Sequence, residues 1–413
     1  MPPDPVSLRQ SRRWFLRIGA AWSAALVACR TKPTAPLPAG ARAPGAPVSS
    51  YGSRSKFETA ARLFNRDTKV PLEEAASFTP LRDTYGMITP SSLHFERHHA
   101  GVPDLDPAAH TLTVHGLVKR PLAFTLDELK RLPSVSRIYF LECSGNSREE
   151  WRGGAANSDV QRTHGLTSCS EWTGVAVATL LGECGVRPGA AWVLAEGADA
   201  CRLARSIPNQ KMMDDALVAY AQNGEPLRPE QGYPMRLLLP GWEGNSNVKW
   251  LRRLKALDQP AMTREETAKY TDLMKDGTAR QFTFMMEAKS LITRPSAGET
   301  LPGPGVYELT GIAWSGRGVI TGVEITIDGG DTWVPAELQA PVLPRAHTRF
   351  RWTWKWDGRE TRFASRCTDE TGYTQPTVGE LVQVRGTNSQ YHNNGIQVWK
   401  IEADGRVING NRA

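Results

Sequence analysis

Residues 139–151 read YFLECSGNSREEW, and this stretch puts a lone cysteine where an apolar run gives way to a turn. The segment 136–143, SRIYFLEC, predicts a buried strand, and the SGN that follows predicts the turn that ends it. Strand ends before glycine turns present side chains into clefts, and Gly145 lets a ligand approach the backbone closely. The stretch therefore places Cys143 at a candidate binding cleft.

The residues by themselves leave four roles open for Cys143: inert packing, half of a disulfide, a nucleophile or a metal ligand. Arg148 is near in sequence, and positive charge favours the thiolate form that a soft metal site requires. A cysteine nucleophile needs a base, and the sequence marks no particular histidine as the partner of Cys143.

Five of the six cysteines lie beyond the N-terminal segment, which is an odd number. If Cys143 is reserved for chemistry, the other four could form two disulfides or none, and their pairing stays open. These four are Cys169, Cys184, Cys201 and Cys367. The sequence has no CxxC and no histidine-rich cluster, so a structural zinc site is not expected.

The chain of 413 residues has the composition of a globular protein, with 40% apolar and 23% charged residues. This length suits two or three domains. Much of the net charge of +7 lies in residues 1–30, where five arginines face a single aspartate. There is no basic helix with interleaved aromatic residues, so no nucleic-acid partner is expected.

The N-terminal stretch 11–29, SRRWFLRIGAAWSAALVAC, is typical of a twin-arginine signal, which exports a folded protein to the periplasm. An amphipathic first helix is the alternative. The LVAC at its end also resembles a lipoprotein box, so a lipid anchor at Cys29 is a second possibility. We predict a signal over residues 1–30 and a Pro/Ala-rich linker over residues 31–50.

The region 51–295 has a mixed pattern. Strands are predicted at 110–118, 136–143, 192–197 and 235–241, a short helix capped by Thr125 at 126–132, and a longer helix at 171–185. These segments do not repeat as regular βαβ units, so we expect an α+β fold.

The region 296–386 changes to short alternating runs separated by Gly and Asp turns, which predicts an all-β sandwich. GELVQVRG at 379–386 is predicted as one of its strands, and Asp328-Gly329-Gly330 as a hairpin turn. In RFRWTWKW, period two puts four aromatic residues on one face: Phe350, Trp352, Trp354 and Trp356. We expect a core or subunit interface there, with a sugar platform as the alternative.

The tail, 387–413, is polar and rich in asparagine. Its apolar side chains would be costly to leave in water, so we expect the tail to dock against the rest of the protein. They are Ile396, Val398, Trp399 and Ile401.

LECSGNSR at 141–148 resembles the molybdenum-binding segment of the sulfite oxidase family, whose pattern is a cysteine, a small residue and then Gly-Asn. Further segments resemble the family in order: FERHHAGVPDLDP (95–107), GLTSCSEWTGV (165–175), GYPMRLLLPG (232–241), NVKWL (247–251), DGGDTW (328–333) and VQVRG (382–386). The resemblance implies a sulfite-oxidase-type molybdopterin domain at 51–295 and an immunoglobulin-like dimerisation domain at 296–386.

The resemblance also implies roles for individual residues. Cys143 matches the thiolate that ligates molybdenum beside the pterin. The catalytic positions of the family are matched by Tyr270, Arg97, Arg148, Arg385 and Trp172, the arginines being those of the oxyanion site. The pterin-contacting positions are matched by His98, His99, Val102, Asp199, Arg236, Asn247, Val248 and Lys249. Simpler roles remain open, namely ion pairing for Arg148 and Arg236, surface exposure for Tyr270 and core packing for Trp172.

The sequence departs from the family pattern at three places. His98-His99 stands in place of an Asn-His pair, and Gln231 in place of a histidine before the Gly-aromatic-Pro run. Asn247 ends a segment in which the family has Gly-Ala-Arg-His. These changes remove cationic groups near the pterin phosphate, which makes Lys249 the firmest of the expected phosphate contacts.

The activity implied is oxygen-atom transfer to sulfur by a molybdenum-molybdopterin cofactor. The resemblance is strongest to members that oxidise sulfane sulfur held on a carrier protein during thiosulfate oxidation, with free sulfite as the alternative. The chain has no haem motif, so electrons are expected to pass to a c-type cytochrome, in a homodimer or a heterotetramer with it. A reductase of S- or N-oxides and a cofactor-free binding or scaffold protein are the rival readings.

Overall fold

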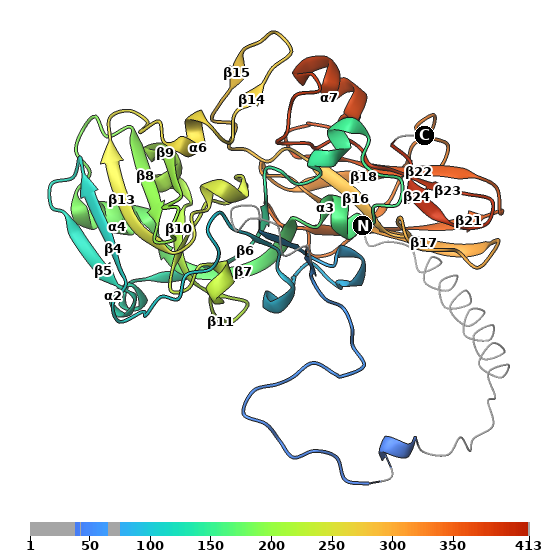
Figure 1. The fold of residues 1–413 in the computed structure, drawn as a ribbon, viewed down its shortest axis with the longest axis horizontal. Coiled ribbons are helices and arrows are strands. Elements are labelled where there is room, and N and C mark those ends of the chain that lie inside the picture. Colours follow the sequence, from blue (N-terminus) through green and yellow to red (C-terminus); the bar gives the residue numbers. More distant parts are fainter. Residues whose placement is uncertain (1–37, 42, 65–74, 412–413) are drawn as a thin grey trace, which may run out of the picture. The chain divides into compact units, whose positions relative to one another are not determined.

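The computed structural model describes residues 38–41, 43–64 and 75–411 (Figure 1). The chain divides into two compact units, Met1–Thr59 and Ala60–Ala413. In the first unit the described residues hold one 3-10 turn, Ala39–Ala41, and are otherwise irregular and exposed. The predicted export signal and Cys29 lie outside the described residues. None of the described helices is long and apolar enough to cross a bilayer.

The first part of the second unit is built on two five-stranded sheets and one small sheet. One large sheet has the order β11-β10-β7-β6, with β12 also paired to β10. Its strands are β6 (Ser134–Glu142), β7 (Thr167–Ala176), β10 (Leu217–Gln222), β11 (Glu225–Pro226) and β12 (Arg236–Leu238). The small sheet holds β1 (Leu63–Phe64), β2 (Ala76–Phe78) and β3 (Glu96–Arg97).

The other large sheet has the order β5-β4-β13-β8-β9 and is mixed, because β13 runs parallel to β4 and antiparallel to β8. Its strands are β4 (Thr111–Gly116), β5 (Leu122–Thr125), β8 (Trp192–Gly197), β9 (Ala204–Pro208) and β13 (Leu251–Leu257). The helices are short: α2 (Leu126–Arg131), α3 (Val160–His164), α4 (Val177–Cys184), α5 (Asn209–Asp214) and α6 (Arg264–Thr267). This arrangement confirms the expected α+β class.

The second part is a sandwich of two antiparallel sheets, as predicted. One sheet is β16 (Lys289–Arg294), β17 (Gly305–Trp314), β21 (Thr348–Trp356) and β20 (Glu337–Gln339). The other is β19 (Val334–Pro335), β18 (Ile320–Thr326), β22 (Thr361–Asp369), β23 (Val398–Ile401) and β24 (Val407–Asn409). A hairpin of β14 (Asp272–Leu273) and β15 (Ala279–Arg280) precedes the sandwich, and α7 (Val378–Arg385) follows β22 (Figure 1).

Two secondary-structure predictions were wrong. The helix expected at 171–185 begins only at Val177, because residues up to Ala176 form β7, which is hydrogen-bonded on both sides by β6 and β10. The strand expected at 379–386 is helix α7. Thr377 accepts a hydrogen bond from the amide of Glu380, and the Glu380 carboxylate accepts one in return, so a capping box starts a helix there.

The tail docks as expected, and it does so by adding strands to the sandwich. β23 pairs with β22, and β24 pairs with β23. The side chains of Trp399 and Ile401 are fully buried in the core between the sheets. This burial stabilises the docked tail, because each large apolar side chain removed from water contributes roughly 1.5–3 kcal/mol.

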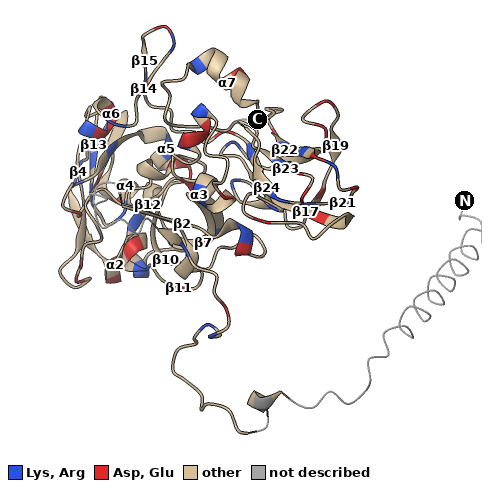
Figure 2. Ribbon diagram, turned by 45° about the vertical axis from the view of Figure 1, so that its right-hand side comes forward, with Lys and Arg blue, Asp and Glu red and all other residues tan. Residues whose placement is uncertain are grey.

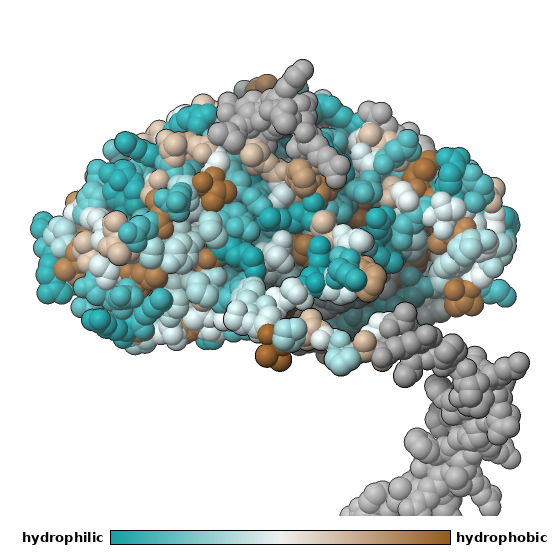
Figure 3. All heavy atoms as spheres, turned by 60° about the horizontal axis from the view of Figure 1, so that its bottom comes forward, coloured by the Kyte–Doolittle hydropathy of each residue, from teal (hydrophilic) through white to brown (hydrophobic). Residues whose placement is uncertain are grey.

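The aromatic face of β21 is a core face rather than a sugar platform. Phe350, Trp354 and Trp356 are buried in the sandwich core, and Trp352 packs against it. The hairpin turn at Asp328 is confirmed, with Gly329 and Gly330 at positive φ. Basic and acidic residues are interspersed over the sheets and loops in Figure 2. On the face drawn in Figure 3, hydrophilic residues predominate and apolar ones form small separate groups.

Candidate active site

Cys143 follows directly on β6, in the turn that the sequence predicts. The carbonyl of Cys143 accepts a hydrogen bond of 2.9 Å from the amide of Asn146. The Asn146 side chain then ties the turn at both ends, donating to a Glu142 carboxylate oxygen at 2.9 Å and accepting from the amide of Leu166 at 3.1 Å. Cys143 is thus held at the junction of β6 and β7, with only 9% of its surface exposed.

A buried ion pair supports this turn from the sandwich side. Nζ of Lys289, on β16, lies 3.2 Å from a Glu142 carboxylate oxygen, and both side chains are 1% exposed. The same ammonium donates to Oγ of Ser147 at 2.6 Å and to the carbonyl of Asn393 at 2.7 Å. Trp314 donates its indole N–H to the other Glu142 oxygen at 2.6 Å. The turn that carries Cys143 is therefore anchored in both parts of the second unit.

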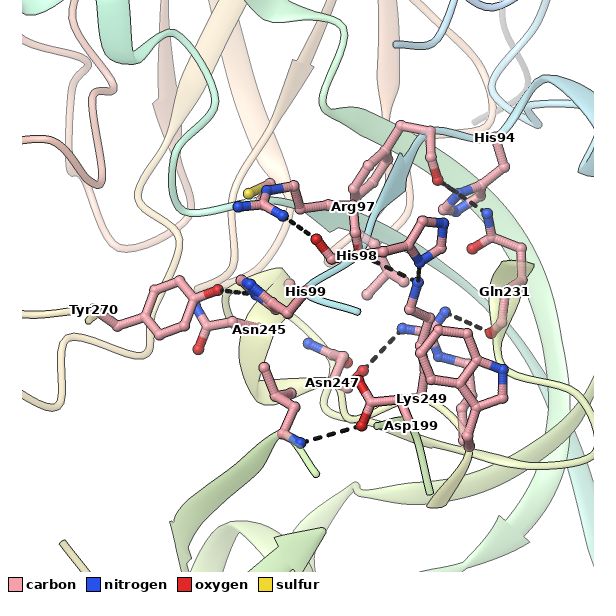
Figure 4. A pocket seen from close by; sticks show the side chains of 17 residues that line it. His94, Arg97, His98, His99, Asp199, Gln231, Asn245, Asn247, Lys249 and Tyr270 are labelled. Carbon is pink, nitrogen blue, oxygen red and sulfur yellow. Dashed lines mark hydrogen bonds between the residues drawn. The ribbon is translucent and has the colours of Figure 1, made fainter. Parts of the chain in front are cut away.

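Two hollows meet at Cys143. The first, which we call the inner cavity, is drawn in Figure 4. Most of the predicted site residues line it: Arg97, His98, His99, Cys143, Asp199, Arg236, Asn247, Lys249 and Tyr270. His94, Phe95, Leu141, Leu203, Gln231, Gly244, Asn245 and Trp250 complete the lining.

Two cationic side chains line the inner cavity, the buried Arg236 and the half-buried Lys249. Nζ of Lys249 donates to the carbonyls of Arg97 at 3.2 Å and Glu230 at 3.0 Å, and lies 2.8 Å from Nδ1 of His98. Burial, and then the charge of Arg236, hold the pKa of Lys249 well below its usual value. Burial lowers the pKa of Arg236 to about 9. Both groups are desolvated, so an anion placed beside them would be strongly favoured.

A molybdopterin cofactor fits these residues. Its phosphate needs cationic donors, which Arg236 and Lys249 supply. Nε of Arg236 and Oδ1 of Asn245 are buried without a hydrogen-bond partner among the described residues, so both can take up polar groups of a ligand. Cys143 offers a soft sulfur ligand at the far wall. Burial raises the pKa of its thiol while Arg97 lowers it, and a bound metal would complete the deprotonation.

The hydroxyl of Tyr270 lies 2.7 Å from Nε2 of His99, and Figure 4 shows this pair at one end of the cavity. Burial raises the pKa of Tyr270 well above its usual value, and the charge of Cys143 adds to this. Burial lowers the pKa of His99 to about 3. The phenol is therefore a neutral donor and the imidazole a neutral acceptor. Tyr270 is buried rather than a surface helix residue.

Two residues stand where the family has cationic side chains, and both form hydrogen bonds with backbone groups. Gln231 donates its side-chain amide to the carbonyl of Phe95 at 2.9 Å. Asn247 accepts from the amide of Leu239 at 2.6 Å and donates to the carbonyl of Glu243 at 2.9 Å. Asn247 lines the inner cavity, but its side chain is committed to the turn around it. Arg236 and Lys249 are therefore the cationic side chains of the inner cavity that would be placed to hold a phosphate.

The second hollow, which we call the outer vestibule, is the larger of the two. It shares Arg97, His99, Cys143 and Tyr270 with the inner cavity. Four further cations line it, opposed by Glu149 alone among the lining residues: Arg148, Arg162, Arg264 and Lys269. Phe78, Gly145, Ser147, Thr163, Leu166, Gln390 and Tyr391 complete it. The predicted oxyanion residues Arg97 and Arg148 thus lie together on the outer side of Cys143.

Four predicted residues line neither hollow. Arg385 is buried, with one guanidinium N–H donating to the carbonyl of His392 at 2.7 Å and another to Glu287 at 2.7 Å. Trp172 is fully buried and packs beneath Arg236, whose guanidinium lies 5.1 Å from the ring, so it is a core residue. Val248 is also in the core, and Val102 is 42% exposed. Of the three arginines predicted for the oxyanion site, the structure brings Arg97 and Arg148 together at one hollow, but not Arg385.

Several residues at the site were not predicted. Arg205 is flanked by the buried carboxylates of Glu243 and Glu266, each at 3.2 Å, and its guanidinium lies 5.2 Å from the Tyr270 ring. Burial alone would raise the pKa of the Glu243 carboxyl, but the charge of Arg205 outweighs burial and lowers that pKa to about 2. His392 reaches Glu243 at 3.2 Å. The signal for His392 was the polar YHNNG run in a tail expected to dock.

All five cysteines within the described residues are free, so none of the possible disulfides forms among them. Cys169 and Cys367 are buried in the sandwich core, and Cys184 is buried in the core of the first part of the second unit. Cys201 donates its S–H to the Asp199 carboxylate at 2.9 Å. Asp199 also accepts from the amide of Leu203 at 3.1 Å, so it shapes the cavity wall.

Comparisons with known proteins agree with this geometry. Residues 99–265 match the oxidoreductase molybdopterin binding domain, and residues 280–399 match the Mo-co oxidoreductase dimerisation domain. The structure of the sulfane dehydrogenase SoxCD from Paracoccus pantotrophus is 45% identical, covers 89% of this chain and 96% of that chain, and superposes with a TM-score of 0.86.

Plant nitrate reductases are also similar. The enzyme of Hordeum vulgare is 33% identical over 71% of this chain and 37% of its own length. The enzyme of Solanum lycopersicum is 34% identical over 71% of this chain and 36% of its own length. The chain thus spans little more than a third of these relatives. From the two domain matches and the likeness to SoxCD over nearly its whole length, the chain belongs to the sulfite oxidase family of molybdopterin oxidoreductases.

Proposed function

We propose that the chain is the molybdenum-bearing subunit of a periplasmic sulfane dehydrogenase. It would oxidise sulfane sulfur held on a carrier protein, in thiosulfate oxidation, and pass the electrons to a c-type cytochrome. The observation that carries this proposal is the outer vestibule, a wide cationic hollow that ends at Cys143. The likeness to the sulfane dehydrogenase SoxCD supports it.

The size of the outer vestibule favours a substrate larger than free sulfite. The space that water-sized groups can reach is about 450 Å³ in the outer vestibule, against about 60 Å³ in the inner cavity. One water molecule needs only about 10–15 Å³ of such space, so an anion of four heavy atoms would fill only a small part of the outer vestibule. An extended peptide arm that carries a sulfur atom to Cys143 would use far more of it.

The charge of the outer vestibule favours sulfur that gains oxygen. Guanidinium groups bind oxyanions through paired N–H donors, which an ammonium group cannot do. Arg97 and Arg148 line the vestibule together with Cys143, so an oxidised sulfur group formed there meets two guanidinium groups. A neutral S- or N-oxide has no need of such cations, which argues against the reductase reading.

The residues of the chain divide the work. When bound, the molybdenum-pterin group supplies oxygen-atom transfer and two-electron redox chemistry. Arg236 and Lys249 hold its phosphate from the inner side. Tyr270, protonated and 2.7 Å from His99, supplies a proton donor where both hollows meet. Arg97 lines both hollows, so its positive charge can stabilise the Cys143 thiolate and a negatively charged substrate.

The setting of the enzyme follows from the same proposal. The twin-arginine signal would export the chain already folded around its cofactor, and we keep a lipid anchor at Cys29 as the lesser alternative. The match to a dimerisation domain over residues 280–399 supports assembly through the sandwich. A cytochrome subunit would complete the complex, as a heterotetramer if two copies of each chain assemble.

The test is turnover by protein purified from a host that exports it through the twin-arginine pathway and makes molybdopterin. Reduction of a c-type cytochrome is measured with a persulfide-loaded carrier protein and with free sulfite, and nitrate reduction with a reduced dye. We expect the carrier substrate to give the highest kcat/KM. Faster turnover of free sulfite would replace sulfane with sulfite as the substrate. Turnover of nitrate alone would overturn the proposal.

A further inference from the structure

Residues 389–394, which we call the strap, run along the turn that carries Cys143. The amide of His392 donates to the carbonyl of Ser144 at 2.8 Å, and the Asn393 carbonyl accepts from Oγ of Ser147 at 3.0 Å. The side-chain amide of Asn393 donates to the Ser147 carbonyl at 3.3 Å. The strap is therefore hydrogen-bonded to both sides of this turn.

The strap is also held from behind. Arg385 donates to the carbonyl of His392 at 2.7 Å, and the amide of Gln390 donates to Asp272 at 2.9 Å. The His392 ring lies 3.2 Å from the Glu243 carboxylate and is 2% exposed. With anchors immediately before and after it, Tyr391 has a fixed backbone position. The role of the buried Arg385 is to hold this segment.

Tyr391 points its ring into the outer vestibule. It lines that hollow together with Cys143, Arg148 and Tyr270, and it does not line the inner cavity. Its ring lies 5.3 Å from that of Tyr270, tilted by 44°. Tyr391 therefore lies only on the outer side of Cys143, whereas Tyr270 lines both hollows.

The hydroxyl of Tyr391 is available to a ligand. No residue in the described part of the chain forms a hydrogen bond with it, whereas that of Tyr270 is engaged by His99. Burial, and then the charge of Cys143, raise the pKa of Tyr391, while Arg148 lowers it. The phenol is thus a neutral donor beside guanidinium groups, which is a suitable combination for an anion with several oxygens.

We propose that Tyr391 is a specificity-determining residue whose hydroxyl donates a hydrogen bond to an oxygen of a sulfur oxyanion held in the outer vestibule. The ligand class is a sulfite, a sulfate or a sulfonate group on sulfur. This inference rests on the proposed function for its biological substrate. The binding itself depends only on the geometry of Tyr391, Arg97 and Arg148, and it can be measured without turnover.

The experiment compares Tyr391→Phe with the wild-type holoenzyme, because phenylalanine keeps the ring against Tyr270 and removes only the hydroxyl. Tyr307→Phe is the matched control. Tyr307 lies on β17 in the sandwich, lines neither hollow and donates its hydroxyl to the carbonyl of Gly303. Inorganic sulfate binding is measured by calorimetry, and KM and kcat are measured with free sulfite. Melting temperature and molybdenum content verify that all three proteins are folded and loaded.

We expect Tyr391→Phe to weaken sulfate binding about tenfold and to raise KM for sulfite by a similar factor, since a hydrogen bond to a charged group is lost. We expect kcat to change by less than about threefold, since the thiolate and Tyr270 are untouched. Unchanged sulfate affinity in Tyr391→Phe would overturn the inference. So would an equal loss in Tyr307→Phe, because the effect would then be general.

The two proposals can fail separately. Wild-type protein that oxidises neither sulfite nor the carrier substrate, yet binds sulfate through Tyr391, would sink the proposed function and uphold this inference. Wild-type protein that is active while Tyr391→Phe binds sulfate and sulfite as well as the wild type would do the reverse. A fall in kcat with unchanged KM would also contradict the assigned role, because it would place Tyr391 in the chemical step.

Discussion

The inner cavity and the outer vestibule share Cys143, yet they hold their cations in opposite ways. In the inner cavity, Arg236 is buried and Lys249 is half-buried, and their donors are already aimed at backbone carbonyls. In the outer vestibule, Arg264 is 57% exposed and Arg162 38% exposed, with carboxylates no nearer than 3.8 Å. Desolvated and fixed cations suit a ligand that stays, and solvated cations suit one that comes and goes.

The comparison also explains why the wall between the two hollows is so firmly built. Under the proposed function, Cys143 would have to keep one position while a cofactor is held on one side and substrates pass on the other. The Glu142–Lys289 pair, Asn146 and the strap all fix its turn. Changes to this wall are expected to have the largest effects, changes in the inner cavity smaller ones, and changes at the outer vestibule the smallest.

The largest effect is expected from Cys143→Ser. Changing groups behind a metal ligand commonly costs 10–100-fold, so loss of the ligand itself should lower turnover by more than about 1000-fold. Sulfur oxidation is measured at matched protein concentration. Cys184→Ala is the control, because Cys184 is buried in α4 and lines neither hollow. Comparable activity in the two variants would remove Cys143 from the metal site.

The next effect is on stability. Lys289→Met leaves the buried Glu142 carboxylate without its cation, so the free energy of unfolding should fall by about 3–5 kcal/mol. Chemical denaturation measures it. Lys400→Met is the control, because Lys400 pairs with Glu360, which is 57% exposed, and such pairs contribute about 0–1 kcal/mol. Equal losses in both variants would show that the turn is not anchored by Lys289.

A smaller effect is expected in the inner cavity. Arg236→Gln removes a desolvated cation, and the pterin content of the purified protein should fall about 10–100-fold. Fluorescence of the released, oxidised pterin measures it. Arg252→Gln is the control, because Arg252 is 39% exposed and pairs with Glu196. Full pterin content in Arg236→Gln would assign the phosphate to Lys249 alone.

The burial of His94 predicts a pH effect on stability. Burial lowers the pKa of His94 to about 3, against an ordinary value of 6.5. Between these two values His94 binds a proton in the unfolded chain but not in the folded chain. The free energy of unfolding therefore falls as pH decreases from 6.5 towards 3. His94→Gln should make this fall less steep by up to about 1.4 kcal/mol per pH unit. Identical pH profiles of the free energy of unfolding would mean that water reaches His94.

The smallest effect is expected at the rim of the outer vestibule. Arg264→Gln and Lys269→Gln should each lower kcat/KM for free sulfite about threefold at low salt, and the loss should vanish near 0.5 M salt. Arg359→Gln, at an 86% exposed side chain on the sandwich, is the control. A loss that persists at high salt would make these residues direct ligands of the substrate.

The sequence predicted the parts of the fold whose signals are local. The capped helix at Thr125, the strand that ends at Cys143 and the hairpin at Asp328 all depend on neighbours within a few residues. Two predictions failed for different reasons. Helix α7 was predicted as a strand although its capping box of Thr377 and Glu380 is local, whereas β7 was missed because distant partners decide it. β7 is a strand through Ala176 because it is paired on both sides, and the apolar period alone could not show that.

The site was predictable where a family motif fixes a residue, and not where it is built by contacts over long distances. Arg97, Arg148, Lys249 and Tyr270 line the expected hollows. Arg385 was expected beside them, but its guanidinium holds Glu287 and the strap. Glu142 and Lys289 lie 147 positions apart, so no motif joins them. Tyr391 reaches the vestibule only because the strap folds back onto the turn.

The central claim is that Cys143 is the single protein ligand of a molybdenum ion between the two hollows. The most direct test is X-ray absorption at the molybdenum edge, with metal content per chain, on wild-type and Cys143→Ser protein exported by its native route. The account predicts about one molybdenum per wild-type chain and one fewer sulfur neighbour, or no metal, in the variant. Folded wild-type protein without molybdenum, or an unchanged sulfur shell in Cys143→Ser, would contradict it.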